Sequence, residues 1–266
     1  MRNIKLTIEY DGTAYCGWQV QNGHSSASSL AHKKTIQEVI ERSLKKILRE
    51  KVRLVSSGRT DAGVHAFMQV ANFKTASGMP LDKLRKGLNA VLPKDIAVNK
   101  AAEANEDFHS RFAARSKTYR YLILNRPHRS ALLKGRAYFY AGPLNIGLMR
   151  QEAKALIGRH NFKAFCASGS SAKDFVRTVN SIRLKKLGYA VAFGGRSAGG
   201  SPLLAIDIEA SGFLYNMVRN ICGTLLEIGR GRFPKGSMKR ILKSEDRGSA
   251  GPTLPAYGLY LERVRY

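Results

Sequence analysis

The sequence has few cysteines and no long apolar stretch. Its three cysteines, Cys16, Cys166 and Cys222, lie far apart and form no Cys-x-x-Cys pair. This spacing indicates neither a disulfide framework nor a zinc knuckle, and it fits a reducing compartment. No run approaches the roughly 18 apolar residues of a membrane span. The N-terminus, MRNIKLTIEY, alternates polar and apolar residues, whereas a signal peptide needs an unbroken apolar core. These absences predict a soluble, cytoplasmic protein.

Signatures of metal and nucleotide sites are also missing. The six histidines form no His-Glu-x-x-His or His-x-x-x-His group with nearby acids. No metal site is therefore implied, which disfavours a metal-dependent nuclease. The glycine-rich stretch 194–200 lacks the Gly-Lys-Ser/Thr ending of a phosphate loop and lies between two strand-like runs. It predicts a hairpin loop.

Acidic residues are scarce relative to basic ones. Asp and Glu number 19 against 45 Lys and Arg, which gives a formal net charge of +26. The excess is spread through the chain and is not confined to a tail. Such a chain repels itself strongly unless its working partner is a polyanion. The composition therefore predicts a nucleic acid as partner.

Hydrophobic periodicity predicts an α+β fold. Alternating patterns predict strands at 4–10, 53–55, 69–73, 95–100, 118–124, 178–186, 203–210 and 258–265. Helical spacing predicts helices at 36–48, 81–92, 145–158, 213–228 and 237–243. These elements show no consistent βαβ alternation, which favours α+β, with helices packed on one face, over a doubly wound sheet.

The length of the chain suggests two parts. At 266 residues it exceeds the usual single-domain size of roughly 100 to 150 residues. The second part repeats the pattern of the first more loosely, which predicts two similar α+β halves, residues 1–105 and 106–266. A basic cleft between the halves would suit RNA. The polar, serine-rich stretch 22–34 predicts a mobile loop that gains order on binding.

The stretch SSGRTDAGVHA, residues 56–66, is the first candidate for chemistry. Gly58 and Gly63 bracket an Arg-Thr-Asp sequence so closely that its three side chains must share one tight turn. Asp61 therefore has two interpretations, a reactive carboxylate held on a loop or an acceptor in an Asx turn. His65 by itself indicates a structural histidine.

The stretch DFHSRFAARSKTYRY, residues 107–121, interleaves basic side chains with aromatic rings. It supplies phosphate-binding charge beside rings on which an unpaired base can stack, a contact worth about 1 to 3 kcal/mol. The side chains are Arg111, Arg115, Lys117, Arg120, Phe108, Phe112, Tyr119 and Tyr121. Tyr119 and Tyr121 share one face of the strand expected at 118–124, so the core is an equally good place for at least one of them.

The stretch FLYNMVRN, residues 213–220, opens an expected helix with an apolar stripe. Arg219 falls at the edge of that stripe. A guanidinium so near an apolar face calls for an anionic partner, because burying an unpaired charge is unfavourable. The alternative is a surface arginine whose stem passes over the core.

Several motifs in order give the chain its resemblance to a known family. DGTAYCGWQVQ, SGRTDAGVHA, LNAVLPKDIAV, FHSRFAARSKTYRY, FLYNMVRNICGTLLEIG and the C-terminal GLYLERVRY run over nearly the full length. Together they make the chain resemble the bacterial TruA-type tRNA pseudouridine synthases. The resemblance implies a homodimer of subunits with two α+β halves, joined sheets and a basic cleft for the tRNA anticodon arm. It also implies isomerisation of uridines 38, 39 and 40 of tRNA to pseudouridine, without a cofactor or a metal.

The resemblance also implies roles for individual residues. Asp61 matches the catalytic nucleophile, although its attack on the ribose, its attack on the base and its action as a base on the ribose all stay open. Tyr119 matches the ring that packs on the target uracil, and Arg219 matches the arginine that keeps the carboxylate ionised and oriented. Arg59 matches the arginine that fills the space left by the flipped nucleotide. Arg111 matches a further RNA contact.

Two features depart from the family pattern. The 22–34 loop is longer than usual, so the docking of RNA beside it is open. Tyr215 and Asn216 stand where relatives often carry histidines, which weakens a proton-transfer role there. The rival hypothesis is a basic tRNA-binding or chaperone module that lost the chemistry; an isomerase needs both Asp61 and Arg219, and both are present.

Overall fold

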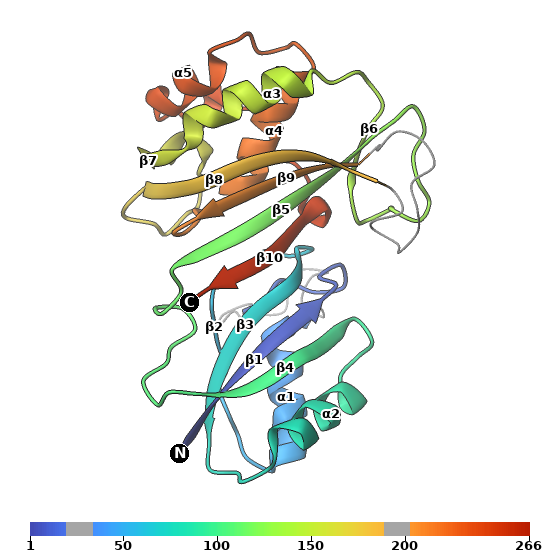
Figure 1. Cartoon of the computed structure of the whole chain (residues 1–266), viewed down its shortest axis with the longest axis vertical. Coiled ribbons are helices and arrows are strands. Elements are labelled where there is room, and N and C mark those ends of the chain that lie inside the picture. Colours follow the sequence, from blue (N-terminus) through green and yellow to red (C-terminus); the bar gives the residue numbers. More distant parts are fainter. Residues whose placement is uncertain (20–33, 189–202) are drawn as a thin grey trace. The chain divides into compact units, whose positions relative to one another are not determined.

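The chain divides into two compact units in the computed structural model, which describes residues 1–19, 34–188 and 203–266 (Figure 1). Unit 1 comprises Met1–Arg115 and Tyr260–Tyr266, and unit 2 comprises Ser116–Leu259. These bounds differ from the expected halves 1–105 and 106–266. The segment after residue 105 stays with unit 1 because Asn3 and Asn72 bind its backbone, and the last seven residues return to the same unit.

Unit 1 is built on a mostly antiparallel sheet. Its strand order is β4 (Ile96–Ala104), β1 (Arg2–Tyr10), β3 (His65–Thr75) and β10 (Leu259–Arg265), with the short β2 (Val55–Ser56) also paired to β3. β1 runs antiparallel to both of its neighbours, whereas β10 pairs with β3 in parallel. The sheet thus sets the start of β3, and the turn that precedes it, beside the start of β10.

Two helices cover one face of this sheet (Figure 1). α1 (Ile36–Leu48) is capped by Thr35, whose hydroxyl accepts the N–H of Glu38. Its buried stripe includes Ile36, Ile40 and Leu44. α2 (Leu81–Val91) buries Leu84 and Leu88. Both helices follow the 3.6-residue period that their sequences show.

Unit 2 has an antiparallel sheet in the order β5 (Ser116–Asn125), β9 (Leu203–Ala210), β8 (Val176–Leu187) and β7 (Gly158–Asn161). The short β6 (Tyr138–Tyr140) pairs with β5 in parallel. Every residue of β9 is buried. The helices α3 (Ile146–Ala153), α4 (Met217–Gly229) and α5 (Ser237–Ser244) lie on one face of this sheet (Figure 1). The expected α+β class, with helices on one face, is confirmed for each unit.

Some boundaries differ from those that periodicity predicts. The helix expected at 213–228 begins at Met217, because Asn216 takes a left-handed conformation with φ of 58°. The helix expected at 145–158 ends at Ala153. The short strands β6 and β7 and four single 3-10 turns were not predicted; the turns are Lys154–Leu156, Lys163–Phe165, Arg247–Ser249 and Ala256–Gly258. The predicted loops at 22–34 and 194–200 fall almost entirely outside the described residues.

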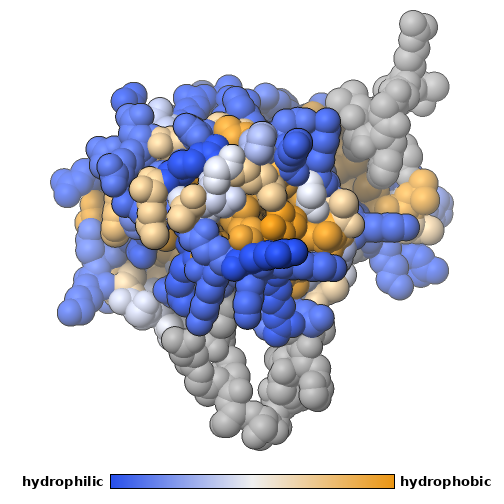
Figure 2. Space-filling model, turned by 90° about the horizontal axis from the view of Figure 1, so that it is seen from below, coloured by the Kyte–Doolittle hydropathy of each residue, from blue (hydrophilic) through white to orange (hydrophobic). Residues whose placement is uncertain are grey.

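Hydrophilic residues cover most of the face shown in Figure 2, and hydrophobic residues gather in one area near its middle. Within the described ranges, no helix has the length and apolar character needed to cross a membrane.

Candidate active site

The turn between β2 and β3 carries two of the predicted site residues. The first residues of the turn are hydrogen-bonded to β3. The Ser57 N–H donates to the Val70 carbonyl at 2.8 Å, and the Ser57 hydroxyl lies 2.7 Å from the Gln69 side-chain oxygen. The Gln69 amide in turn donates to the Gly58 carbonyl at 3.0 Å. The strand therefore determines where the turn begins.

Thr60 anchors the middle of the turn inside unit 1. Its hydroxyl lies 2.8 Å from the Tyr10 hydroxyl, and its carbonyl accepts the Trp18 N–H at 3.0 Å. Burial raises the pKa of Tyr10, so its hydroxyl stays neutral in this contact. Thr60 is buried, whereas Arg59 before it is exposed and Asp61 after it is half-buried. The residue between the two predicted functional side chains thus serves as their anchor.

Two glycines allow the chain to close on this turn. A β-carbon at Gly17 would lie 2.5 Å from the Thr60 carbonyl oxygen and 3.1 Å from the Asp61 carbonyl carbon. Only glycine fits at such a close approach. Gly63, with φ of 78°, completes the turn, and the Val64 N–H donates to the Asp61 carbonyl at 3.1 Å. The backbone of Asp61 is therefore held from both sides.

His65, at the start of β3, makes its contacts inside unit 1. Its Nδ1 lies 2.9 Å from Asp11 Oδ1, and its ring stacks on Tyr260 with centroids 4.7 Å apart. The imidazole is almost fully buried. These contacts match the structural role predicted for this histidine.

Tyr119 lies on β5 in unit 2. It is 8% exposed. The Tyr119 and Phe213 rings pack edge to face, with their centroids 5.0 Å apart. Its strand neighbour Tyr121 is fully buried and donates to the Pro255 carbonyl at 2.8 Å. Both tyrosines therefore belong to the packing of unit 2, and Tyr119 is the slightly more exposed of the two.

Arg219 lies in the first turn of α4. Its Nε donates to the Leu254 carbonyl at 2.6 Å, and its Nη1 donates to Asn216 Oδ1 at 2.7 Å. A guanidinium has five N–H donors. Among the described residues these two bonds engage two of the five, which leaves donors for an anion. The side chain is half-buried, and both of these acceptors are neutral groups.

The segment that supplies the Leu254 carbonyl is itself held by Arg247. One guanidinium nitrogen of Arg247 donates to the Gly251 carbonyl at 3.0 Å, and the other lies 3.1 Å from Asn220 Oδ1 and 3.0 Å from Thr253 Oγ1. Desolvation lowers the pKa of Arg247. The brace on Arg219 therefore depends on a partly buried polar network behind it.

The predicted residues divide between the two units. Arg59 and Asp61 flank the anchored threonine of one turn in unit 1, and Arg111 is exposed on a second turn of the same unit. Tyr119 and Arg219 belong to unit 2. Their combination with Asp61 joins residues of different units and stays a prediction.

Comparison with known proteins identifies the family. A family model described as tRNA pseudouridine synthase matches residues 6–113 and 153–266. The chain belongs to this family. It is 46% identical to tRNA pseudouridine synthase A of Caldicellulosiruptor bescii and 45% identical to the protein of that name from Acetivibrio thermocellus, with the whole of each chain aligned. It is also 46% identical to tRNA pseudouridine synthase A of Geobacter sp. strain M21, over the whole of this chain and 99% of the relative.

The chain is thus a tRNA pseudouridine synthase, an isomerase. Arg59, Asp61 and Arg111 fall in the first matched stretch, and Arg219 falls in the second. Tyr119 lies between the two stretches, in a part of the synthase that only the full-length alignments to relatives cover.

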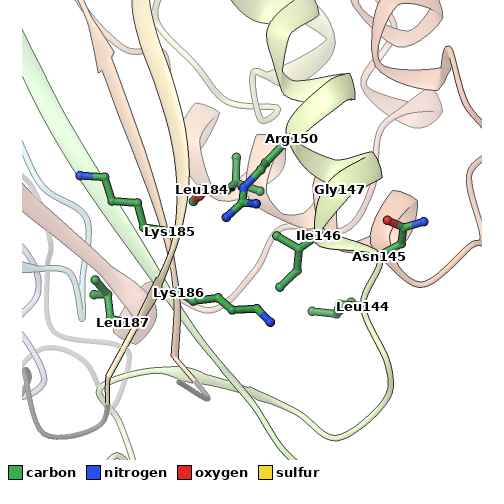
Figure 3. A pocket seen from close by; sticks show the side chains of 9 residues that line it. All are labelled: Leu144, Asn145, Ile146, Gly147, Arg150, Leu184, Lys185, Lys186 and Leu187. Atoms are coloured by element: carbon green, nitrogen blue, oxygen red, sulfur yellow. Dashed lines mark hydrogen bonds between the residues drawn. The ribbon is translucent and has the colours of Figure 1, made fainter. Parts of the chain in front are cut away.

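Unit 2 of the synthase also contains a surface hollow of about 790 Å³ between α3 and β8. Its lining residues are Leu144, Asn145, Ile146, Gly147, Arg150, Leu184, Lys185, Lys186 and Leu187. Figure 3 shows Lys186 directed into the space beside Ile146 and Leu144, whereas Lys185 points to the other side of the strand. None of the predicted site residues lines this hollow.

The described part of the synthase has no group of three or more His, Cys, Asp and Glu side chains that could hold a metal ion. No disulfide joins the three cysteines in the part of the chain that the structure describes. Burial raises the pKa of Cys222, which keeps that thiol protonated.

Sequence reasoning missed the residues that support the site. Thr60 and Gln69 position the turn, and Asn216 and Leu254 position Arg219. Gly17, beside a tryptophan in a polar stretch, offered a signal of close backbone approach. The Leu254 carbonyl offered none, because every residue carries a carbonyl and only the fold selects one.

Proposed function

We propose that this synthase isomerises uridines 38, 39 and 40 in the anticodon arm of tRNA, with Asp61 as the catalytic nucleophile. The proposal depends on the turn that bears Asp61, whose backbone is held by hydrogen bonds and by the close approach of Gly17. The chain that presents this carboxylate belongs to a tRNA pseudouridine synthase family. A carboxylate on a turn with bound backbone is preorganised, so little reorganisation is needed when the substrate arrives.

The reaction rearranges one nucleoside without net oxidation. The bond between ribose C1′ and uracil N1 breaks, the ring turns, and a bond forms between C1′ and C5. C5 loses a proton and N1 gains one, so atoms and electrons balance. The Asp61 carboxylate suits attack on the ribose, attack on the base or proton removal from the ribose. None of these routes needs a cofactor or a metal.

Arg219 and Tyr119 complete the site in this proposal. A guanidinium paired with the Asp61 carboxylate keeps it ionised and oriented. The brace from Leu254 and Asn216 supports this role, because it holds the guanidinium while leaving donors for the carboxylate. Tyr119 packs on the target uracil, while Phe213 supports the Tyr119 ring.

Arg59 and Arg111 serve the RNA. Arg59, exposed next to Asp61, enters the space left when the target nucleotide is extruded from its stack. Arg111 contacts the RNA from the second turn of unit 1. A basic cleft between two similar halves receives the anticodon arm, and the enzyme acts as a cytoplasmic homodimer. The net charge of +26 supports a cleft of this sign.

Replacing Asp61 with Asn tests the assignment. The substitution keeps the size of the side chain and leaves the carbonyl that accepts the Val64 N–H, so the turn should persist. We expect Asp61→Asn to bind tRNA with nearly wild-type affinity and to form no pseudouridine. The measurement is pseudouridine mapping of tRNA incubated with each protein, together with a filter-binding titration.

Asp82→Asn is the matched control, because Asp82 is an exposed carboxylate of α2 that pairs only with neighbouring Arg85 and Lys86 in the described structure. It should retain full activity. Pseudouridine formation by Asp61→Asn would refute the assignment, and modification only outside positions 38 to 40 would refute the proposed target.

A further inference from the structure

The turn after β4 presents an aromatic ring to solvent. Phe112 is 78% exposed, the largest exposure among aromatic side chains in the described ranges. Its ring stacks on His109, with centroids 4.2 Å apart and an interplanar angle of 26°. The Arg111 guanidinium lies 5.8 Å from the ring centre. At this exposure, these two neighbours leave most of the ring accessible.

The turn is rigidly attached to unit 1. Ser110 is fully buried, and both its N–H and its hydroxyl donate to Asn72 Oδ1, at 2.9 and 2.7 Å. The Ser110 carbonyl accepts the Tyr266 hydroxyl at 2.9 Å. The Phe108 carbonyl accepts the side-chain amides of Asn3 and Asn72, at 2.9 and 3.2 Å. The backbone beneath the exposed ring is therefore held on several sides.

His109 braces the ring itself. Its Nδ1 accepts the N–H of Arg111 at 3.2 Å and that of Phe112 at 3.3 Å, and its carbonyl accepts the Ala113 N–H at 2.9 Å. These bonds hold the imidazole under the phenyl ring. An aromatic side chain fixed in this way loses little conformational entropy when a partner stacks on it.

The charge around the turn suits an anionic partner that also carries rings. Arg111 and Arg115 are exposed, and the Lys5 ammonium lies 5.2 Å from the centre of the Phe108 ring. The acids nearby, Glu106 and Asp107, are exposed on the side of the turn that precedes Phe108. A nucleic acid offers both phosphates for the cations and flat bases for the ring.

We propose that Phe112, supported by His109, is a stacking platform for an unpaired nucleobase of the tRNA substrate. Arg111 binds a phosphate beside that base. The inference depends on tRNA being the substrate, and it is independent of the role assigned to Asp61. Stacking on Phe112 is separate from the contact proposed for Tyr119, because Phe112 lies in unit 1 and Tyr119 in unit 2. The platform contributes binding and orientation and takes no part in the chemical step.

Three substitutions test the platform. Phe112→Ala removes the ring, and Phe112→Leu keeps an apolar side chain without a π face. Both should fold normally, because the residue is exposed. Loss of one base stack predicts roughly 5- to 150-fold weaker tRNA binding for both variants, with an unchanged single-turnover rate at saturating tRNA. Leu132→Ala is the control, since Leu132 is a 71% exposed apolar residue of unit 2.

Fluorescence gives a direct readout of stacking. The chain has one tryptophan, Trp18, which is 1% exposed. Phe112→Trp adds a solvent-exposed indole whose emission a stacked base should quench on titration with tRNA. Leu132→Trp, titrated in the same way, controls for quenching without stacking.

Three results would overturn the proposal. The first is tRNA affinity within about twofold of wild type in Phe112→Ala, a loss far below that of one stacked base. The second is a change in oligomeric state of Phe112→Ala, measured by sedimentation, which would assign the ring to a contact between copies of the chain. The third is loss of turnover in Phe112→Ala at saturating tRNA, which would contradict a binding role. If the Asp61 assignment fails, Asp61→Asn forms pseudouridine. Failure of that assignment is therefore distinguishable from failure of the Phe112 proposal.

Discussion

At the scale of single residues, Tyr119 has to satisfy both the fold and the proposed chemistry. The ring is buried beside Phe213, and Tyr119 pairs with Ile208 on the neighbouring strand β9. Removing such a ring leaves a cavity, and truncation of a buried aromatic residue typically lowers the free energy of unfolding by about 3 to 5 kcal/mol. Tyr119→Ala therefore mixes instability with lost function, and Tyr119→Phe is the sharper variant.

We expect Tyr119→Phe to fold with a loss of less than about 1.5 kcal/mol, because the swap conserves shape. It should keep tRNA affinity, since the packing ring remains. Any loss should appear in the single-turnover rate at saturating tRNA, where a step that uses the hydroxyl is measured. Weakened binding with an unchanged rate would contradict the packing role.

Single residues also show where sequence reasoning stopped. The sequence pattern of 107–121 marks a basic and aromatic region. It could not distinguish the side chains that stabilise the fold from those that face solvent. Arg120 makes a two-point ion pair with Asp207, at 2.7 and 3.0 Å, and so serves the fold of unit 2. Phe112, with the same local pattern, is exposed. Alternation along a chain assigns a side chain to a face, and only the neighbouring strands decide what that face meets.

At the scale of elements, α4 and the 250–255 segment approach each other at backbone distance. A β-carbon at Gly223 would lie 1.8 Å from the Pro252 carbonyl oxygen, and one at Gly251 would lie 2.7 Å from Thr224 Cα. The Gly251 N–H donates to the Thr224 hydroxyl at 2.9 Å. This contact sets the distance between Arg219 and the carbonyl that braces it.

Gly223→Ala should push the 250–255 segment away from α4. Overpacking of this kind costs about 1 to 3 kcal/mol, and a chain of this size loses roughly 2 to 4 °C of Tm for each kcal/mol. We also expect a lower single-turnover rate with unchanged tRNA affinity, because Arg219 loses its brace. Thermal unfolding and pseudouridine mapping measure both effects.

Gly78→Ala is the control, because a β-carbon there meets nothing within 4 Å. It should match wild type in both measurements. Equal stability of the Gly223 and Gly78 variants would contradict the close approach. A less stable Gly223 variant with normal catalysis would show that the segment does not position Arg219.

At the scale of the whole molecule, the dominant property is charge. A net charge of +26 on 266 residues favours association with a polyanion. Binding of RNA by several cations releases counterions, and the affinity falls as salt rises.

We expect the logarithm of tRNA affinity to fall linearly with the logarithm of salt concentration, with a slope of about −3 or steeper. Asp61→Asn is the protein to titrate, since it binds without turnover. Arg111→Ala should reduce the slope by about 1, because Arg111 binds one phosphate in the proposal above. A flat salt response would contradict the proposed basic cleft, and an unchanged slope in Arg111→Ala would remove Arg111 from the phosphate contacts.

The sequence by itself determined the fold class, the helices α1 and α2, the main strands and the turn that carries Asp61. Those features depend on local periodicity, capping and glycine spacing, which neighbouring residues specify. Only the tertiary structure decided that Thr60 anchors the turn, that the Leu254 carbonyl braces Arg219 and that Phe112 faces solvent while Tyr121 does not. These outcomes depend on contacts between residues distant in sequence, and a carbonyl or a ring acquires its role only from what the fold places beside it.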